Sequence, residues 1–312
     1  MSKKVLVTGA AGFLGSNLCK RLVADGFHVT GVDNLYTGTL HNLQTLRTHP
    51  QFTFVQHDII QPLNLACDWL FNFACPASPP HYQKDPIFTA KTNFIGALNM
   101  LELAHKNNAR IMQASTSEVY GNPLQHPQTE TYWGNVHTTG PRACYDEGKR
   151  VAESLFFDYK RIHKLDIKVI RIFNTYGPLM DPNDGRVVSN FIMQALRGEP
   201  ITVYGTGEQT RSFCYVDDLI NGIMAMMHSD ASITGPINLG NPIEFTLKEL
   251  VETLSTALGK PLPLITMPLP EDDPTRRQPD ITLAKQILRW QPQVDLATGL
   301  KHTIAYFRQF VS

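Results

Sequence analysis

Short apolar runs alternate with helix-like segments through the first half of the chain. Runs of the length expected for buried strands occur at 5–7, 29–32, 52–55, 70–73, 111–114 and 168–173. Between them, apolar positions recur at helical spacing at 12–25, 93–106 and 144–163. Strands that alternate with helices form βαβ units with right-handed crossovers. The pattern therefore predicts an α/β fold with a Rossmann-like, doubly wound parallel sheet.

The pattern changes after Gly177-Pro178, where proline and glycine become denser. Here we predict strands at 201–204 and 237–240, and helices at 187–197, 219–228, 247–258 and 281–288. Asp217-Asp218, Thr246 and Asp280 stand where N-caps of the last three helices are expected. We expect a sheet domain over 1–178, to which 212–242 return, and a smaller C-terminal α/β domain that is mainly 179–312 and binds substrate.

Composition and charge exclude several classes of protein. Of the 312 residues, 42% are hydrophobic and 18% are charged, and 28 basic residues balance 28 acidic ones. A neutral chain has no overall attraction to nucleic acid or to an anionic membrane, so we expect neither partner. No apolar run approaches the roughly 18–20 residues of a membrane span, and the run near the N-terminus is too short for a signal peptide. Five scattered cysteines argue against disulfides and a zinc site, so we expect no metal and a cytoplasmic location.

A glycine-rich turn lies between the first expected strand and the first expected helix. Gly9, Gly12 and Gly15 let the backbone turn tightly and approach a pyrophosphate, and the helix N-terminus supplies free N–H donors. Asp33 ends the second strand, eighteen residues after Gly15, where a carboxylate binds ribose hydroxyls and repels a 2′-phosphate. These features predict that the sheet domain binds NAD rather than NADP. Asp58, after the third strand, either reaches the adenine edge or is a solvated loop residue.

A second group of residues is typical of proton-transfer chemistry. Tyr145 and Lys149 stand four residues apart at the start of an expected helix, so they share one face. A tyrosine with a pKa near 10 is a poor base at neutral pH, but a neighbouring ammonium favours its phenolate. Thr116, Ser117 and Glu118 follow the strand at 111–114, at the sheet edge where open α/β proteins bind ligands. Glu118 is therefore either a catalytic carboxylate or half of a structural salt bridge.

These motifs resemble the extended short-chain dehydrogenase/reductase superfamily, essentially from end to end. Within it, the chain is most similar to the UDP-glucuronate decarboxylase (UDP-xylose synthase) family. The segments that carry this resemblance are ASPPHY at 77–82, STSEVYGN at 115–122, PRACYDEGKR at 141–150, RIFNTYGP at 171–178, NDGRVVSNF at 183–191, VYG at 203–205, QTRSF at 209–213, and DDP at 272–274 through Arg277 and PD at 279–280. The glycine motif and the Tyr145/Lys149 pair mark only the superfamily, whereas TSE and NDGR together are far more specific.

The resemblance implies which residues bind each group. Arg277 would join Thr116, Ser117, Glu118, Tyr145 and Lys149 in catalysis, with its neighbour Arg276 as the alternative for that position. Besides the three glycines, Asp33, Tyr145 and Lys149, the implied NAD contacts are Phe13, Leu14, Asn34, Tyr36, Thr37, Gly38, Asp58, Ile59, Phe73, Cys75, Thr92 and Ala114. The implied contacts to a UDP-sugar are Tyr82, Lys91, Asn174, Thr175, Arg186, Tyr204, Gln209, Arg211 and Arg277.

The implied reaction is decarboxylation of UDP-glucuronate to UDP-xylose through a UDP-4-keto intermediate, with bound NAD reduced and reoxidised within one turnover. The alternatives are a UDP-hexuronate 4-epimerase, which usually lacks the carboxylate at position 118, and a related dehydratase, in which Asp-Glu is expected after Thr116. A UDP-apiose/xylose synthase is expected to carry Cys at position 117, and a non-catalytic NAD sensor is expected to lose Tyr145 and Lys149. The resemblance also implies a homodimer formed by the helices at 93–106 and 144–163, although the same apolar stripes would serve an internal core.

Overall fold

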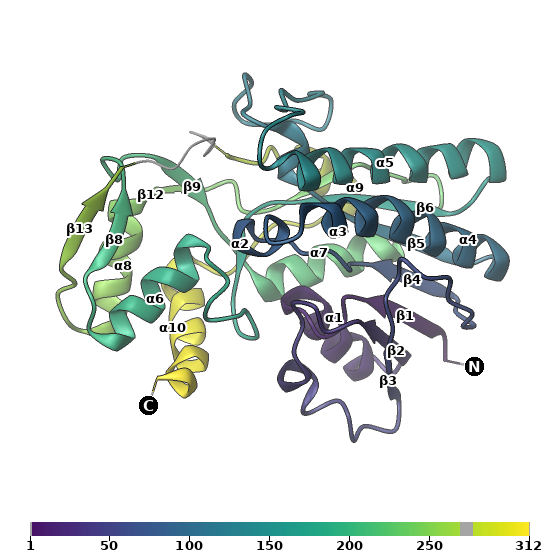
Figure 1. Ribbon diagram of the computed structural model, residues 1–312, viewed down its shortest axis with the longest axis horizontal. Helices are drawn as coiled ribbons and strands as arrows, with labels where there is room; N and C mark the ends of the chain where they lie inside the picture. Colours follow the sequence, from purple (N-terminus) through teal and green to yellow (C-terminus); the bar gives the residue numbers. More distant parts are fainter. Residues whose placement is uncertain (1, 269–276, 312) are drawn as a thin grey trace.

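Seven parallel strands form the main sheet of the computed structural model, which describes residues 2–268 and 277–311. Their spatial order is β11-β6-β5-β4-β1-β2-β3 (Figure 1). Most are short apolar runs buried on both faces, as expected for a parallel sheet covered by helices. The strands are β1 (Lys4–Thr8), β2 (His28–Asp33), β3 (Phe52–Gln56), β4 (Trp69–Asn72), β5 (Arg110–Thr116), β6 (Ile167–Ile172) and β11 (Ile237–Leu239). The predicted Rossmann-like, doubly wound sheet is confirmed.

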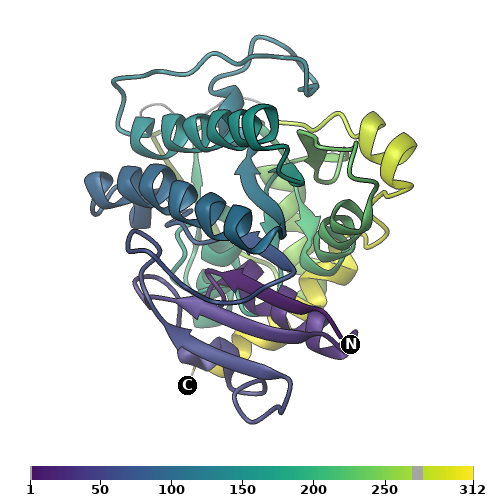
Figure 2. The same cartoon turned by 90° about the vertical axis from the view of Figure 1, so that its right-hand side faces the viewer.

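Helices cover both faces of this sheet (Figure 1). On one face lie α3 (Pro86–Lys91), α4 (Ala97–Asn107) and the long α5 (Ala143–His163). Figure 2 shows α5 lying beside the α3–α4 segment on this side. On the other face α1 (Phe13–Ala24) packs against α7 (Val216–His228). Each face therefore has its own apolar core.

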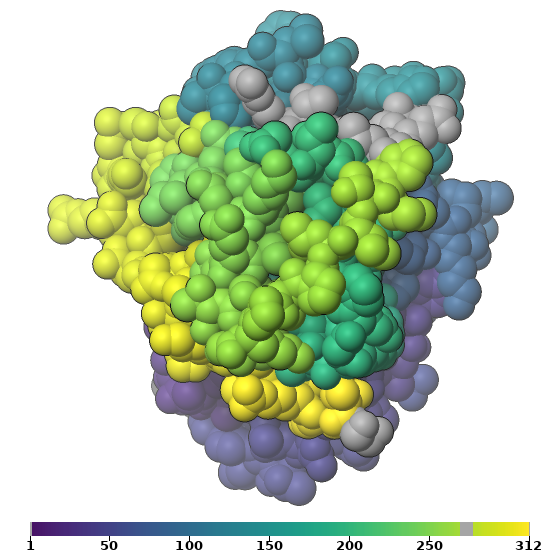
Figure 3. Space-filling view, turned by 90° about the vertical axis from the view of Figure 1, so that its left-hand side faces the viewer, coloured from purple at the N-terminus to yellow at the C-terminus, as the bar shows by residue number. Residues whose placement is uncertain are grey.

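A smaller lobe lies beside the carboxyl ends of the strands and faces the viewer in Figure 3. Two strand pairs belong to it, β13 with β8 in parallel and β12 with β9 in antiparallel register. Its elements are α6 (Val187–Arg197), β8 (Ile201–Tyr204), β9 (Thr210–Ser212), β12 (Glu244–Thr246), α8 (Leu247–Leu258), β13 (Leu264–Met267) and α10 (Leu296–Phe307).

The chain passes from the sheet domain into the smaller lobe, returns to the sheet domain, and then enters the lobe a second time. β10 (Cys214–Tyr215) pairs with β7 (Thr175–Tyr176), and α7 and β11 then rejoin the sheet domain. The core between α1 and α7 continues without a break into the lobe, because Leu18 and Leu22 belong to the same buried cluster as Leu254 and Phe307. Two further short helices are α2 (Pro79–Tyr82) and α9 (Thr282–Leu288).

Most of the predicted elements are confirmed within a few residues at their ends, but some predictions are wrong. The helix predicted at 93–106 is confirmed, although its first residues form a π-helical turn at Thr92–Gly96 that continues α3 into α4. Asp217-Asp218 do not cap α7, because the helix already begins at Val216 and Tyr215 is its N-cap residue. The Asp218 carboxylate instead accepts bonds from the backbone N–H groups of Gln293 (2.9 Å) and Val294 (2.8 Å).

The other two predicted N-cap residues, Thr246 and Asp280, both accept hydrogen bonds at the start of their helices. Thr246 caps α8 in a capping box with Glu249, which satisfies two helix-end donors reciprocally. Asp280 accepts a bond from the backbone N–H of Thr282 at 2.8 Å, although α9 itself starts at Thr282 with Ile281 as its N-cap.

Within the described ranges, the helices are too short or too polar to cross a bilayer.

Candidate active site

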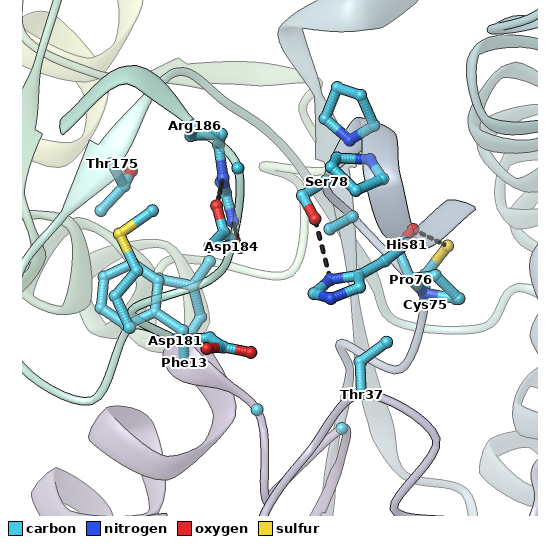
Figure 4. Close-up of a pocket in the computed structure, with 18 of the residues that line it drawn as sticks. Phe13, Thr37, Cys75, Pro76, Ser78, His81, Thr175, Asp181, Asp184 and Arg186 are labelled. Carbon is cyan, nitrogen blue, oxygen red and sulfur yellow. Dashed lines mark hydrogen bonds and ion pairs between the residues drawn. The ribbon is translucent and has the colours of Figure 1, made fainter. Parts of the chain in front are cut away.

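A cavity of about 1010 Å³ opens at the carboxyl ends of the sheet strands, between the sheet and the smaller lobe. Figure 4 shows Arg186, Asp184 and Thr175 on one wall and Ser78, His81 and Cys75 on the opposite wall. Helix α2 and the segment before it carry the second wall, where the Ser78 hydroxyl lies 2.8 Å from Nδ1 of His81. Open α/β sheets bind ligands at this edge, so the cavity is the candidate active site.

The glycine-rich turn after β1 leaves no room for a side chain at Gly9 or Gly15. Gly9 has φ +69°, and a Cβ there would lie 2.8 Å from the carbonyl oxygen of Phe73. A Cβ on Gly15 would lie 2.0 Å from the carbonyl oxygen of Gly9. Helix α1 then begins at Phe13 with Gly12 as its N-cap and no side chain capping its first N–H groups. Bare backbone and free helix-end donors at the cavity suit a pyrophosphate, so this turn fits a dinucleotide.

The Asp33 carboxylate is held beside this turn by the backbone. Its oxygens accept bonds from the N–H groups of Ala11 (2.9 Å) and Leu35 (2.7 Å), and burial nevertheless raises its pKa above the usual value. A Cβ on Gly38 would lie 2.9 Å from both carboxylate oxygens, so Gly38 admits the close packing around Asp33. Asp58 lines the cavity and accepts a bond from the Asn34 side-chain amide at 3.0 Å.

The other residues expected to contact NAD line the same cavity, apart from Gly38, which packs against the Asp33 carboxylate. Those that line it are Gly9, Gly12, Phe13, Leu14, Gly15, Asp33, Asn34, Tyr36, Thr37, Asp58, Ile59, Phe73, Cys75, Thr92, Ala114, Tyr145 and Lys149. The residues present therefore fit the cofactor that the sequence predicts.

Tyr145 and Lys149 point from the first turns of α5 into the cavity, and both are buried. The Lys149 ammonium donates to the carbonyl oxygen of Ala114 at 2.9 Å and lies 5.7 Å from the centroid of the Tyr145 ring. Burial raises the pKa of Tyr145 well above its usual value, and the Thr116 hydroxyl opposes this by hydrogen bonding. Burial also lowers the pKa of Lys149. The expectation that Lys149 favours the phenolate is thus outweighed here by desolvation, which disfavours both charged forms.

Glu118 lies between two arginines at the end of β5. It belongs to the 3₁₀ turn Ser117–Tyr120, and its backbone N–H donates to the Thr116 hydroxyl at 3.2 Å. Its carboxylate accepts from Arg142 (Nη2, 2.9 Å) and from Arg277 (Nη1, 3.4 Å). Burial opposes its ionisation, but the charges of Arg277 and Arg142 prevail and lower its pKa to about 2. Glu118 therefore forms salt bridges and also lines the cavity, so the two interpretations of the sequence are not exclusive.

Arg142 is a cavity residue that the sequence reasoning missed. It precedes α5 by one residue, and its only sequence signal is its place in the segment PRACYDEGKR. Arg277 is buried and lines the cavity, as expected, whereas Arg276 lies outside the described residues.

Residues expected to bind the UDP-sugar gather on the lobe side of the cavity. Arg186 is paired with the carboxylate of Asp184, with Nη2 and Oδ1 2.9 Å apart. The Gln209 amide donates to the backbone carbonyl of Tyr204 at 2.5 Å, and Tyr204 remains 42% exposed. Those that line the cavity are Asn174, Thr175, Arg186, Tyr204, Gln209, Arg211 and Arg277.

Two of the expected substrate contacts lie elsewhere. Lys91 is exposed at the end of α3 and does not line the cavity. Tyr82 is fully buried behind Tyr145, and the two rings are stacked with centroids 5.0 Å apart. The structure therefore gives Tyr82 a packing position.

Comparison with known proteins agrees with this site. The model of the NAD dependent epimerase/dehydratase family matches residues 5–240. UDP-glucuronic acid decarboxylase 1 of Xenopus tropicalis is 51% identical over 307 residues, which is 98% of this chain and 72% of the relative. UDP-glucuronic acid decarboxylase 6 of Arabidopsis thaliana is 53% identical over 298 residues, which is 95% of this chain and 86% of the relative.

A solved structure resembles the whole fold. UDP-glucuronic acid 4-epimerase from Bacillus cereus, in complex with UDP-glucuronic acid and NAD, superposes with a TM-score of 0.89 at 28% identity. The match covers 98% of this chain and 99% of that one. The higher identity is to the decarboxylases, and the glycine turn, Tyr145, Lys149 and Glu118 lie together in one cavity. The chain therefore belongs to the NAD dependent epimerase/dehydratase family and, within it, to the UDP-glucuronic acid decarboxylases.

Proposed function

We propose that this enzyme converts UDP-glucuronate to UDP-xylose and CO2, with NAD that stays bound throughout the turnover. The observation that carries the proposal is the placement of Glu118 between Arg142 and Arg277, in the same cavity as Tyr145. An epimerase needs only to move a hydride at C4, whereas a decarboxylase must also bind a carboxylate and manage a proton at C5. A buried cluster of two cations and a carboxylate suits that added task.

Tyr145 is the base for the sugar 4-hydroxyl in this proposal. Thr116 is placed to hold the hydroxyl and the phenol together, because it already hydrogen-bonds Tyr145. NAD, held by the glycine turn and Asp33, would supply the hydride acceptor for C4. With that cation beside it, Lys149 would favour the Tyr145 phenolate that burial alone disfavours.

Oxidation at C4 prepares the loss of CO2. A C4 ketone lies β to the sugar carboxylate, so the electrons of the breaking C–C bond pass into the carbonyl group as an enolate. Arg277 is placed to bind the carboxylate, and its bond to Glu118 is the longer of the two arginine contacts. Arg186 and Arg211 on the lobe side would bind the diphosphate, since arginine forks match phosphate oxygens.

We further propose a homodimer formed through α4 and α5. Large apolar side chains remain exposed on this layer, including Ile162 (71%), Phe94 (45%) and Val151 (36%). Light scattering on the purified protein tests the dimer, and Ile162→Glu is expected to shift it toward monomer.

A cytoplasmic location remains a prediction from the odd number of scattered cysteines.

The experiment that tests the activity is direct. The protein is incubated with UDP-glucuronate and NAD, and the sugar nucleotide is identified by NMR. UDP-xylose is the expected product, and UDP-galacturonate would show that the chain is a 4-epimerase.

A further inference from the structure

The proposed reaction needs a proton that the substrate does not supply. Loss of CO2 leaves an electron pair at C5, and a hydrogen must take the place of the carboxylate. Tyr145 is not its source, because the proton that it removes from the 4-hydroxyl is needed again when C4 is reduced. Each turnover therefore consumes one proton from outside, and a group near C5 has to hold it.

Asp146 is the carboxyl group placed for this task. It follows Tyr145 in the first turn of α5, is 7% exposed, and its carboxyl group lies within hydrogen-bonding reach of the Glu118 side chain. Two carboxyl groups in such contact cannot both be ionised without strong repulsion, so the pair retains one proton. Oδ1 of Asp146 is buried and has no hydrogen-bond partner among the described residues. An unpaired buried oxygen costs less in a neutral carboxyl than in a carboxylate, which favours the proton on Asp146.

The charged groups around the pair strengthen this preference. Arg142 and Arg277 both contact Glu118, so the negative charge is best placed there. Tyr82, from α2, faces the same cluster as a neutral phenol, because burial raises its pKa. Burial and the charge of Glu118 raise the pKa of Asp146 to about 8, whereas that of Glu118 is lowered. Among the residues that the structure describes, those that face Asp146 are thus one carboxylate, two cations and one neutral phenol.

We propose that Asp146 and Glu118 share one proton and that Asp146, acting through Glu118, supplies the proton that replaces the carboxylate at C5. This inference rests on the proposed decarboxylation. Asp146 does not line the cavity, so it is a positioning residue and Glu118 is the group that reaches the substrate.

The transfer balances in protons and electrons. A substrate carboxylate that binds Arg277 removes one cation from Glu118, which makes Glu118 the better base and draws the proton from Asp146. CO2 leaves, the O–H bond on Glu118 breaks, and the C5–H bond forms with the electron pair left by the departed carboxylate. Solvent then returns one proton to the pair, which matches the net uptake of one proton per turnover.

Asp146→Asn tests this proposal, because asparagine keeps the size and a donor toward Glu118 but holds no transferable proton. Asp158→Asn is the matched control, since Asp158 lies on the same helix with its side chain 47% exposed. Three quantities are measured: reduction of the bound nicotinamide by UDP-glucuronate, formation of UDP-xylose, and the position of deuterium at C5 of UDP-xylose made in D2O. A fourth measurement, on the protein without substrate, is the infrared band of a protonated carboxyl between about pH 6 and pH 10.

We expect Asp146→Asn to lower UDP-xylose formation about 100-fold while C4 oxidation stays within about threefold of wild type. The deuterium should occupy one face of C5 in wild type and both faces in the variant, since a random solvent donor then replaces a fixed one. The infrared band should be present in wild type and in Asp158→Asn, and absent in Asp146→Asn.

Several outcomes would overturn the proposal. UDP-xylose formation near the wild-type rate, with deuterium still on one face, would show that another group supplies the proton. Equal loss of C4 oxidation and of UDP-xylose would show that Asp146 acts on Tyr145 instead. If Asp146→Asn fails to fold, Asp146→Glu should preserve the infrared band and the single deuterated face, and their loss in a folded Glu variant would refute proton sharing. A wild-type protein that makes no UDP-xylose would refute the proposed function, while the infrared band still decides whether the pair shares a proton.

Discussion

The phenol rings of Tyr82 and Tyr145 are stacked almost parallel, with centroids 5.0 Å apart and an angle of 7° between their planes. Tyr82 is fully buried, and its hydroxyl has no hydrogen-bond partner among the residues that the structure describes. The ring of Tyr82, rather than its hydroxyl, therefore fixes the position of the Tyr145 phenol.

This stack predicts different effects for two substitutions of Tyr82. Tyr82→Ala should cost about 3–5 kcal/mol of unfolding free energy and slow C4 oxidation, because it leaves a cavity behind Tyr145. Tyr82→Phe keeps the ring and removes an unpaired hydroxyl, so stability should be unchanged or higher by about 1 kcal/mol. Denaturant unfolding measures both, and a Phe variant as unstable as the Ala variant would show that the hydroxyl is essential.

Glu118→Gln should separate the two halves of the reaction. The amide keeps the shape of the side chain but loses the charge that pairs with Arg142 and Arg277. We expect C4 oxidation to continue, seen as absorbance of the reduced nicotinamide, while UDP-xylose formation falls about 10²- to 10⁴-fold. Tyr145→Phe is the contrasting variant and should abolish oxidation as well. Unchanged turnover of Glu118→Gln would remove Glu118 from the mechanism.

Arg186→Ala should weaken the binding of the UDP-sugar more than it slows the chemistry. Arg186 lies on the lobe wall of the cavity, where Asp184 orients its guanidinium. We expect KM for UDP-glucuronate to rise about 10- to 100-fold with kcat little changed, because the diphosphate contact is made in both the ground and transition states. Arg47→Ala, at an exposed position that does not line the cavity, is the control and should change neither constant. A fall in kcat at unchanged KM would place Arg186 in the chemical step.

The stability of the fold should depend on pH through Asp146. Its folded-state pKa is raised to about 8, above the unfolded value near 4, so the folded chain holds the proton more tightly. The resulting stabilisation is full below pH 4 and is lost as the pH rises through 8. Between about pH 6 and pH 9, the Tm of wild type should therefore fall more steeply than that of Asp146→Asn. Circular dichroism melts measure this difference, and parallel curves would contradict the raised pKa.

The sequence was informative where local pattern decides structure. Buried strands such as β4 need continuous apolar residues, and α8 carries its own capping box, so both were predictable. The helix α10 and the strand β13 were missed. β13 is exposed along its whole length, so its short apolar run of Leu264, Ile265 and Met267 does not mark a buried strand, and a proline stands directly before and after it in the sequence.

Within the site, backbone-dependent features were easier to predict than side-chain directions. The glycine spacing that begins at Gly9 predicts a tight backbone turn directly from the sequence. The four-residue spacing of Tyr145 and Lys149 likewise predicts that they share one face of a helix. Whether Arg142 turns inward or Lys91 turns outward depends on packing between elements far apart in the chain. Such directions do not follow from local spacing.

The interleaved path of the chain has a consequence for how such an enzyme can change its specificity. After the chain has entered the smaller lobe, α7 and β11 return to the large sheet, and one apolar core spans the sheet domain and the lobe. The lobe therefore cannot be exchanged as an independent unit. Grafting 179–312 from a relative would also replace the β11 edge strand and the helix that packs on α1. New substrates are therefore expected to be reached by point changes in the cavity loops, with recombination of whole lobes disfavoured by the shared core.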